Sequence, residues 1–315
     1  VSSVVKFFCF HRKGYTSVAG VFQEWIRMEN DNDSAIRAKL ENALQRRVRA
    51  WQALAGGMIS RVLRVELDDG DTLVAKIGDG GHDLTIEAYM LRYLRANSGL
   101  PAPAVLHDDP SLLIMEYVPG RSEWEGEPLR HLGKLLAGCH QVTSAAYGLE
   151  RDTLTGPLRQ PNRPMKSWIA FFREQRLLYM IGVARASGHL PAALEQRLLH
   201  LAEDLEQFLI EPRRPALIHG DMWRTNVIAR NGRVAGIIDP ALYYAHNEME
   251  LAYMTLFSGT GSEFFSAYGR HIPIEVDFYS TRRHIYNLYP LLVHLTLFGQ
   301  KYLQPIEETL KRFDY

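Results

Sequence analysis

A polar loop set between apolar segments, from Leu217 to Asp239, constrains this chain more than any other feature. The apolar run Ala216 to Ile218 predicts a short buried strand, and the loop from His219 to Asn226 follows it directly. Polar side chains held at the end of a buried strand are typical of an active site, because the strand fixes their positions.

A predicted hairpin follows that loop. Residues 226–230 and 233–238 read as two strands, and Asn231-Gly232 between them favours a turn with positive φ at both positions. Since a hairpin returns to where it began, its last residue is expected close to the loop. The sequence therefore predicts that three polar side chains converge, those of Asp221, Asn226 and Asp239.

This set has the composition needed for phosphoryl transfer from a nucleotide. In a kinase catalytic loop an Asp accepts the proton of the acceptor hydroxyl, and an Asn five residues later and a more distant Asp hold magnesium. We expect Asp221 to be the catalytic base, and Asn226 and Asp239 to be the ligands of Mg²⁺. The alternative is a turn rich in Asn and Asp followed by an ordinary hairpin.

A lysine upstream supports the kinase interpretation. Lys76 is the one charged residue in the predicted strand 72–77, and burying an ammonium group is costly without a partner. Kinases carry such a lysine against the nucleotide phosphates, paired with a Glu on the next helix, and Glu87 lies near the start of the predicted helix 84–94. The alternative is a lysine on an edge strand with its head group in solvent.

Two further segments are expected to contact the nucleotide. Backbone N–H groups beside Gly56-Gly57 could approach phosphate oxygens, although a glycine pair between strands is often only a turn. Residues 115–120 resemble the hinge between two lobes, where a kinase binds adenine. The predicted nucleotide contacts are therefore Gly57, Met58, Ile59, Ser60, Glu116 and Val118, in addition to Lys76 and Glu87.

Together these elements predict an α+β, protein-kinase-like fold with two lobes. Residues 1–34 are expected to be an N-terminal extension, and because Met28 resembles a natural start, the segment 1–27 before it could be non-native. Residues 35–117 would form the nucleotide-binding lobe, with a five-stranded antiparallel sheet and a helix. Residues 118–315 would form a mostly helical lobe that carries the catalytic loop and the metal-binding hairpin. The predicted helices are 36–51, 84–94, 129–139, 165–185, 194–208, 249–257 and 263–268, and a long apolar and aromatic stretch at 278–303 is expected to pack in the core.

Composition narrows the class of protein. Of the 315 residues 46% are apolar, and Lys plus Arg equals Asp plus Glu at 36 each, so no basic excess points to nucleic acid or an anionic membrane. No apolar run reaches the length of a membrane span. The two cysteines, Cys9 and Cys139, fit a reducing compartment, and we expect a cytoplasmic protein. The sequence does not predict the oligomeric state.

The motifs in their order resemble those of the fructosamine kinase (ketosamine kinase) family, a branch of the aminoglycoside-phosphotransferase-like kinases. The resemblance spans about residues 35–313. Its most specific parts are His-Gly-Asp-x-Trp-x-x-Asn from His219 and Asp-Pro-Ala from Asp239, with further similarity at Tyr243-Tyr244, His246, Glu248 and Glu250-Leu251-Ala252. The chain departs from the family at Arg224-Thr225, at Asn247 and at Met58, and the first two departures put the sugar identity in doubt.

The resemblance implies an enzyme that uses ATP to phosphorylate the third-carbon hydroxyl of a ketosamine, which is a sugar joined to an amine by glycation. The unstable product would release the amine, so the reaction would remove the glycation. The substrate would be a small ketosamine or a glycated amine on a protein. Trp223 could stack on the sugar, and His246 and Glu248 could line the acceptor site, although Trp223 could equally pack under its own loop and Glu248 could cap a helix.

Two other functions stay open. The first is a related kinase whose acceptor is an aminoglycoside or an amino alcohol, which a strongly acidic pocket would favour. The second is a nucleotide-binding pseudokinase that serves as a scaffold. The presence of all five kinase residues argues against the scaffold.

Overall fold

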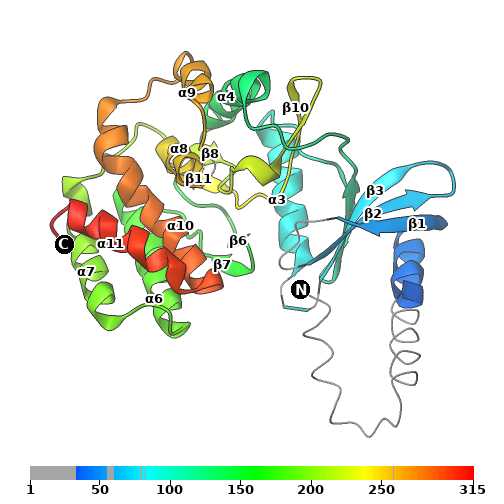
Figure 1. The fold of residues 1–315 in the computed structure, drawn as a ribbon, viewed down its shortest axis with the longest axis horizontal. Coiled ribbons are helices and arrows are strands. Elements are labelled where there is room, and N and C mark those ends of the chain that lie inside the picture. Colours follow the sequence, from blue (N-terminus) through cyan, green and yellow to red (C-terminus); the bar gives the residue numbers. More distant parts are fainter. Residues whose placement is uncertain (1–32, 55–59, 79, 82, 258) are drawn as a thin grey trace, which may run out of the picture. The chain divides into compact units, whose positions relative to one another are not determined.

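The computed structural model describes residues 33–54, 60–78, 80–81, 83–257 and 259–315 (Figure 1). The predicted contacts Gly57, Met58 and Ile59 lie outside the described residues, as does residue 28 of the predicted extension. Within the described part the chain forms two compact units. The first comprises residues up to Gln52 with Val65–Thr72, and the second comprises Ala53–Arg64 with Leu73–Tyr315. The division into lobes at residue 117 stays a prediction.

The first unit corrects one predicted helix. Residues 33–44 are helical, but Gln45 has a positive φ of 54° that ends the helix, and Val48–Ala53 forms strand β1. The predicted helix was too long because apolar residues recur at helical spacing as far as Val48 and Trp51. The β-branched and aromatic side chains at these positions favour a strand, and the guanidinium of Arg37 lies 4.8 Å from the centre of the Trp51 ring.

A five-stranded sheet has the strand order β1-β2-β3-β5-β4. Strand β5 pairs antiparallel with both β3 and β4, in agreement with the predicted α+β fold. Helix α3 (Leu84–Asn97) begins at Asp83, whose carboxylate accepts a hydrogen bond from the Thr85 amide, and it packs against β4 and β5. The other strands are β2 (Arg61–Leu67), β3 (Thr72–Ile77), β4 (Val105–Asp109) and β5 (Leu112–Glu116).

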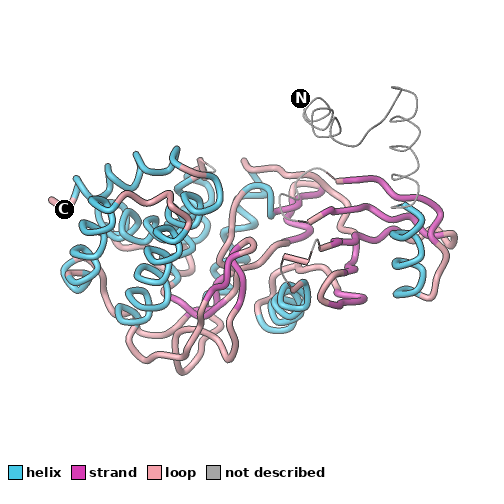
Figure 2. The backbone as a smooth tube through the Cα atoms, turned by 90° about the horizontal axis from the view of Figure 1, so that it is seen from below, coloured by secondary structure: helices cyan, strands magenta, loops and turns pink. Residues whose placement is uncertain are grey.

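The remainder of the second unit is mostly helical, as predicted (Figure 2). The predicted helix 165–185 is present as α5, a π-helical segment and α6, and the apolar stretch 278–303 contains a π-helical segment and α10. Helix α11 was not predicted, and it buries only Ile306, Thr309 and Leu310. The bounds are α4 (Gly126–His140), α5 (Trp168–Phe171), η2 (Phe172–Leu178), α6 (Tyr179–Ala186), α7 (Ala192–Glu203), η3 (Leu205–Gln207), α8 (Asn247–Leu256), α9 (Ser262–Gly269), η5 (Phe278–Arg282), α10 (Arg283–Phe298), η6 (Gln300–Tyr302) and α11 (Leu303–Arg312).

Three pairs of short strands cross this helical region. Strand β8 (Ala216–Ile218) pairs with β11 (Tyr243–Ala245), and β6 (Thr153–Thr155) pairs with β7 (Leu158–Gln160). Strands β9 (Val227–Arg230) and β10 (Arg233–Ile237) form the predicted hairpin. Its turn has φ values of 53° at Asn231 and 71° at Gly232, which confirms the predicted turn conformation.

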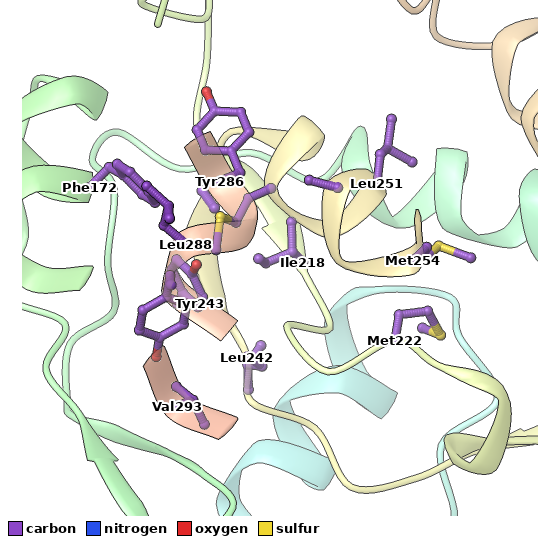
Figure 3. Packing of buried hydrophobic residues seen from close by; sticks show 14 of the residues in the cluster. Phe172, Ile218, Met222, Leu242, Tyr243, Leu251, Met254, Tyr286, Leu288 and Val293 are labelled. Atoms are coloured by element: carbon purple, nitrogen blue, oxygen red, sulfur yellow. The ribbon is translucent and has the colours of Figure 1, made fainter. Parts of the chain in front are cut away.

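Aromatic side chains from distant segments form the centre of the helical core (Figure 3). Trp168, Phe172, Tyr243 and Tyr286 are each at most 1% exposed. The indole nitrogen of Trp168 donates a hydrogen bond of 2.9 Å to the hydroxyl of Tyr286, so these two buried polar groups satisfy each other. In the described part of the chain, no helix is long and apolar enough to cross a membrane. The cytoplasmic location stays a prediction.

Helix α4 offers a matched test of this packing. A Cβ atom on Gly133 would lie 2.7 Å from the carbonyl oxygen of Phe264 in α9, whereas a Cβ atom on the exposed Gly138 would meet nothing within 4 Å. We expect Gly133→Ala to lower the free energy of unfolding by about 1–3 kcal/mol, because the two helices must move apart. Gly138→Ala should raise it by about 0.5–1 kcal/mol. Urea unfolding of both variants checks the pair, and equal midpoints would contradict the packing.

Candidate active site

A cleft of about 630 Å³ lies within the second unit. Nine of the residues that were predicted to form the site line it together, although they come from six separate parts of the chain. The nine are Ser60, Lys76, Glu87, Glu116, Val118, Asp221, Trp223, Asn226 and Asp239.

Lys76 on β3 joins two of these parts. Its ammonium nitrogen lies 2.5 Å from a carboxylate oxygen of Glu87 on α3 and also bonds the carboxylate of Asp239 after β10. Burial by itself lowers the pKa of a lysine, but the carboxylates of Asp239 and Glu87 outweigh it and raise the pKa of Lys76 above its ordinary value. Lys76 is therefore a fixed positive charge in the cleft, and it is not the solvent-exposed edge lysine of the alternative interpretation.

Asp221 lies in the loop after β8, with both carboxylate oxygens bonded. The hydroxyl of Tyr253 donates a 2.5 Å hydrogen bond to Oδ1, and the side-chain amide of Asn226 donates a 2.9 Å hydrogen bond to Oδ2. Burial raises the pKa of Asp221, while these two hydrogen bonds favour its charged form and limit the rise. The carboxylate is thus oriented and made more basic than a carboxylate in water.

A buried carboxylate behind the loop holds it in place. The Glu250 oxygens accept hydrogen bonds from the backbone amides of His219 at 3.1 Å and Gly220 at 2.7 Å. Burial would raise the pKa of Glu250, but the hydrogen bonds from His140 and from the Gly220 amide lower it overall, so Glu250 stays charged. Gly220 has a φ of 86°, and a Cβ atom there would overlap the carbonyl oxygen of Ala241, so only glycine fits this bend.

The hairpin brings Asp239 back to the loop, as the sequence predicted. The Ile238 amide donates a 3.0 Å hydrogen bond to the carbonyl oxygen of Asn226, and a ring nitrogen of His219 lies 3.0 Å from the carbonyl oxygen of Ile238. Asp239 itself has a φ of 56°, a conformation that aspartate tolerates better than most residues. His219 thus connects the loop to the hairpin by its hydrogen bonds.

Asn226 and Asp239 offer oxygen atoms that suit a magnesium ion. Because the amide nitrogen of Asn226 is bonded to Asp221, Oδ1 is the Asn226 atom that could bind a metal ion. No group of three or more His, Cys, Asp or Glu side chains in the described ranges could hold a metal ion. A nucleotide-bound Mg²⁺ needs only one or two protein oxygens beside phosphate and water.

The end of β5 forms another wall of the cleft. Residues Met115 to Val118 line it, as predicted for a hinge. The Glu116 carboxylate accepts a 3.1 Å hydrogen bond from the Ala104 amide, so this side chain is engaged by the protein itself. Ser60 lines the cleft at the edge of the segment that contains the glycine pair.

Two predicted acceptor residues are placed elsewhere. His246 and Glu248 are each 5% exposed, and neither is among the described residues that line the cleft. A ring nitrogen of His246 lies 2.9 Å from the Tyr286 hydroxyl, and burial lowers the pKa of this histidine to about 3, so it is neutral. Glu248 lies in the first turn of α8 and accepts two hydrogen bonds from the guanidinium of Arg282. Both side chains are thus bonded within the core, and the position of Glu248 in the first turn of α8 agrees with the helix-terminus alternative for that residue.

Sequence reasoning assigned no role to Glu250 or Tyr253. A signal was available, because Glu250 is a charged residue within the apolar segment Met249 to Ala252, just as Lys76 is in its strand. Tyr253 follows three positions later, on the adjacent turn of the same helix. Its hydroxyl bonds the side chain of Asp221, whereas Glu250 bonds the backbone amide of Gly220, the residue before Asp221.

Comparison with known proteins shows the family to which the chain is related. A model of the fructosamine kinase family matches residues 32–313. The chain is 32% identical to the chloroplastic protein-ribulosamine 3-kinase of Arabidopsis thaliana over 266 residues, which cover 79% of this chain and 78% of the plant protein. It is 30% identical to a probable ketoamine kinase of Vibrio parahaemolyticus over 267 residues, which cover 82% and 90% of the two chains.

Comparison with solved structures also finds a protein of this family. A candidate fructosamine-3-kinase of Thermobifida fusca superposes with a TM-score of 0.79 at 30% identity, covering 88% of this chain and 97% of the other. The aminoglycoside phosphotransferase APH(4)-Ia superposes with a TM-score of 0.62 at 18% identity, covering 89% and 97%, which shows a shared fold. These similarities confirm the predicted protein-kinase-like class.

The buried carboxylate makes a prediction about stability. Because the folded protein holds the pKa of Glu250 below its ordinary value, its charge stabilises the fold at neutral pH and this contribution is lost as pH falls through the folded pKa. We expect Glu250→Gln to lower the free energy of unfolding by about 3 kcal/mol at pH 7 and by less in acid. Glu307→Gln, at an exposed pair with Lys311, should change it by less than about 0.5 kcal/mol. Urea unfolding at several pH values measures this, and a difference that persists unchanged into acid would reject the role of the charge.

Tyr253→Phe tests how the Asp221 carboxylate is tuned. The Tyr253 hydroxyl lowers the pKa of Asp221, so its removal should raise that pKa and move the acid limb of the kcat/KM profile to higher pH. Nucleotide affinity should change little, since Tyr253 contacts the loop carboxylate. Steady-state rates across pH check this, and an unmoved acid limb with lower activity would show that Tyr253 acts only through packing.

Proposed function

The chain belongs to the fructosamine kinase family, and from this premise we propose that it transfers the γ-phosphate of ATP to the third-carbon hydroxyl of a ketosamine. The observation that carries the proposal is the meeting of Lys76, Glu87, Asp221, Asn226 and Asp239 around one cleft. A metal-bound triphosphate and an alcohol require these five groups together.

Asp221 is the residue proposed to act on the acceptor. Its carboxylate would accept the proton of the reacting hydroxyl, and Tyr253 and Asn226 hold it at a fixed angle. Little proton removal is required before transfer, because the transition state of phosphoryl transfer is loose, so a carboxylate is an adequate base. Trp223 lines the cleft two residues further along, partly exposed, where its ring could stack on a sugar face.

Lys76, Asn226 and Asp239 are proposed to hold the nucleotide end. The ammonium group of Lys76 would contact the α and β phosphates, kept in position by Glu87. Asn226 and Asp239 would supply oxygen ligands to Mg²⁺, which when bound neutralises the charge that develops on the phosphates. We further propose backbone contacts from the Gly57 to Ser60 segment to the phosphates, and from Glu116 and Val118 to adenine.

The acceptor is proposed to be a ketosamine, either free or carried by a protein amine. Phosphorylation at the third carbon would make the adduct unstable, so that it releases the amine and thereby removes the glycation. The name of the Arabidopsis relative, a protein-ribulosamine 3-kinase, supports this class of acceptor.

The alternatives gain less support. A polycationic aminoglycoside would require a strongly acidic acceptor pocket, and of the described cleft-lining residues from Tyr253 onward none is acidic. The similarity to APH(4)-Ia therefore supports a shared fold and not a shared acceptor. A pseudokinase scaffold is disfavoured because the five kinase side chains are all present and line one cleft.

A panel of small fructosamines and ribulosamines with Mg·ATP tests the proposal. We expect phosphorylation of at least one ketosamine. Turnover of an unrelated alcohol without turnover of any ketosamine would reject the acceptor class. Asp221→Ala should lower kcat by about 10²–10⁴-fold with nucleotide affinity largely kept, since the base contacts the acceptor. Asp239→Ala should instead weaken Mg·ATP binding, measured by titration, and an unchanged nucleotide Kd would count against its metal role.

A further inference from the structure

Helix α3 is contacted on two opposite sides. On one side Glu87 lines the cleft and bonds Lys76. Tyr89 and Tyr93 follow Glu87 by two and six positions, which places them roughly 200–240° around the helix axis from it. Because the two tyrosines are four residues apart, they share one face of α3. The helix that supplies the partner of Lys76 is therefore held from behind as well as from the cleft.

The two tyrosines bond the region that follows the five-stranded sheet. The Tyr89 hydroxyl donates a hydrogen bond to the Glu150 carboxylate, and the guanidinium of Arg151 lies 4.4 Å from the centre of the Tyr89 ring. The Tyr93 hydroxyl lies 3.1 Å from the hydroxyl of Tyr244, and these two rings meet edge to face with their centres 6.5 Å apart. Helix α3 is thus bonded to residues that follow it by 61 and 151 positions.

The partners of these tyrosines belong to one backbone arrangement. Tyr244 in β11 exchanges two backbone hydrogen bonds with Gly148, of 2.9 and 3.0 Å, and Glu150 follows Gly148 by two residues. Tyr244 also lies opposite Leu217 in the pair of β11 with β8, and the loop that carries Asp221 begins directly after β8. The two tyrosines therefore fasten α3 to the strand pair from which the catalytic loop starts.

The position of α3 decides how the Lys76 ammonium is shared. In the structure it bonds both Glu87 and Asp239, and the Asp239 side chain is still 43% exposed. A shift of α3 away from the sheet would remove Glu87 and leave Lys76 paired with Asp239 alone. A Mg²⁺ ion would then have to displace the ammonium from that carboxylate, and it would bind less tightly because the ion pair is lost.

We propose that Tyr89 and Tyr93 are positioning residues for the nucleotide site. Their hydroxyls hold α3 where Glu87 reaches Lys76, which keeps the Asp239 carboxylate available to Mg²⁺. Neither tyrosine is among the described residues that line the cleft, so both act through Glu87. This inference rests on the proposed function, because that function assigns Lys76 and Asp239 to Mg·ATP.

A double-mutant cycle on nucleotide affinity tests the inference. Titration with a non-hydrolysable ATP analogue and Mg²⁺ gives the Kd without any acceptor. One hydrogen bond changes an equilibrium about two- to tenfold, so Tyr89→Phe combined with Tyr93→Phe should raise this Kd about fivefold. In a Glu87→Ala background the same two changes should raise it less than about twofold, because their effect passes through Glu87.

The single variant Tyr93→Phe keeps the ring and loses only one hydroxyl. It should raise the Kd about twofold in the wild-type background and leave it unchanged in the Glu87→Ala background. This cycle remains informative if the combined variant fails to fold, since phenylalanine preserves the edge-to-face contact with Tyr244.

A matched change elsewhere on α3 separates positioning from stability. Arg92→Gln removes an exposed ion pair with Asp108 of β4 and should leave the Kd unchanged. A purely structural role of the tyrosines would lower the urea midpoint and raise the Kd equally in both backgrounds. That result, or an unchanged Kd in the wild-type background, would overturn the inference while the proposed function stands. If the wild type does not bind the nucleotide with Mg²⁺, the proposed function fails and the inference fails with it.

Discussion

The ion pairs of Lys76 with Glu87 and Asp239 are the interaction on which the rest of the site depends. They join a strand, a helix and the end of a hairpin whose residues are separated by more than half of the chain. A buried ammonium is stable only with such partners, and each carboxylate in turn depends on the lysine. Because the lysine favours the charged state of both carboxylates and they favour the charged state of the lysine, the cleft contains a fixed cluster of charges, which is what a triphosphate with a metal ion requires.

Behind this cluster, a buried carboxylate holds the loop that carries Asp221. The Glu250 carboxylate accepts backbone N–H groups of the loop, and His140 satisfies it from the other side. Buried charges are costly unless fully bonded, so this arrangement leaves the loop little freedom to take another conformation. The geometry at Asp221 is therefore decided largely by a helix that follows it in sequence.

The two ends of the cleft differ in their chemistry. Around Lys76 and Asp239 charged groups are close together and bonded to one another. Along α8 and α10 the lining is mainly apolar and aromatic, with an exposed lysine at its far end. Such a surface suits an acceptor with a flat or apolar body. This contrast explains how a fold shared with an aminoglycoside phosphotransferase can serve a different acceptor.

The sequence alone determined the hairpin turn at Asn231-Gly232, the convergence of its ends, and the buried Lys76, because local backbone preferences and the cost of burying charge act through neighbouring residues. Three features were decided only by the tertiary structure. Val48–Ala53 became a strand although its spacing fits a helix, His246 and Glu248 turned into the core, and Tyr253 reached Asp221. Each outcome depends on side chains far away in the sequence, and no local pattern encodes which partner a side chain finds.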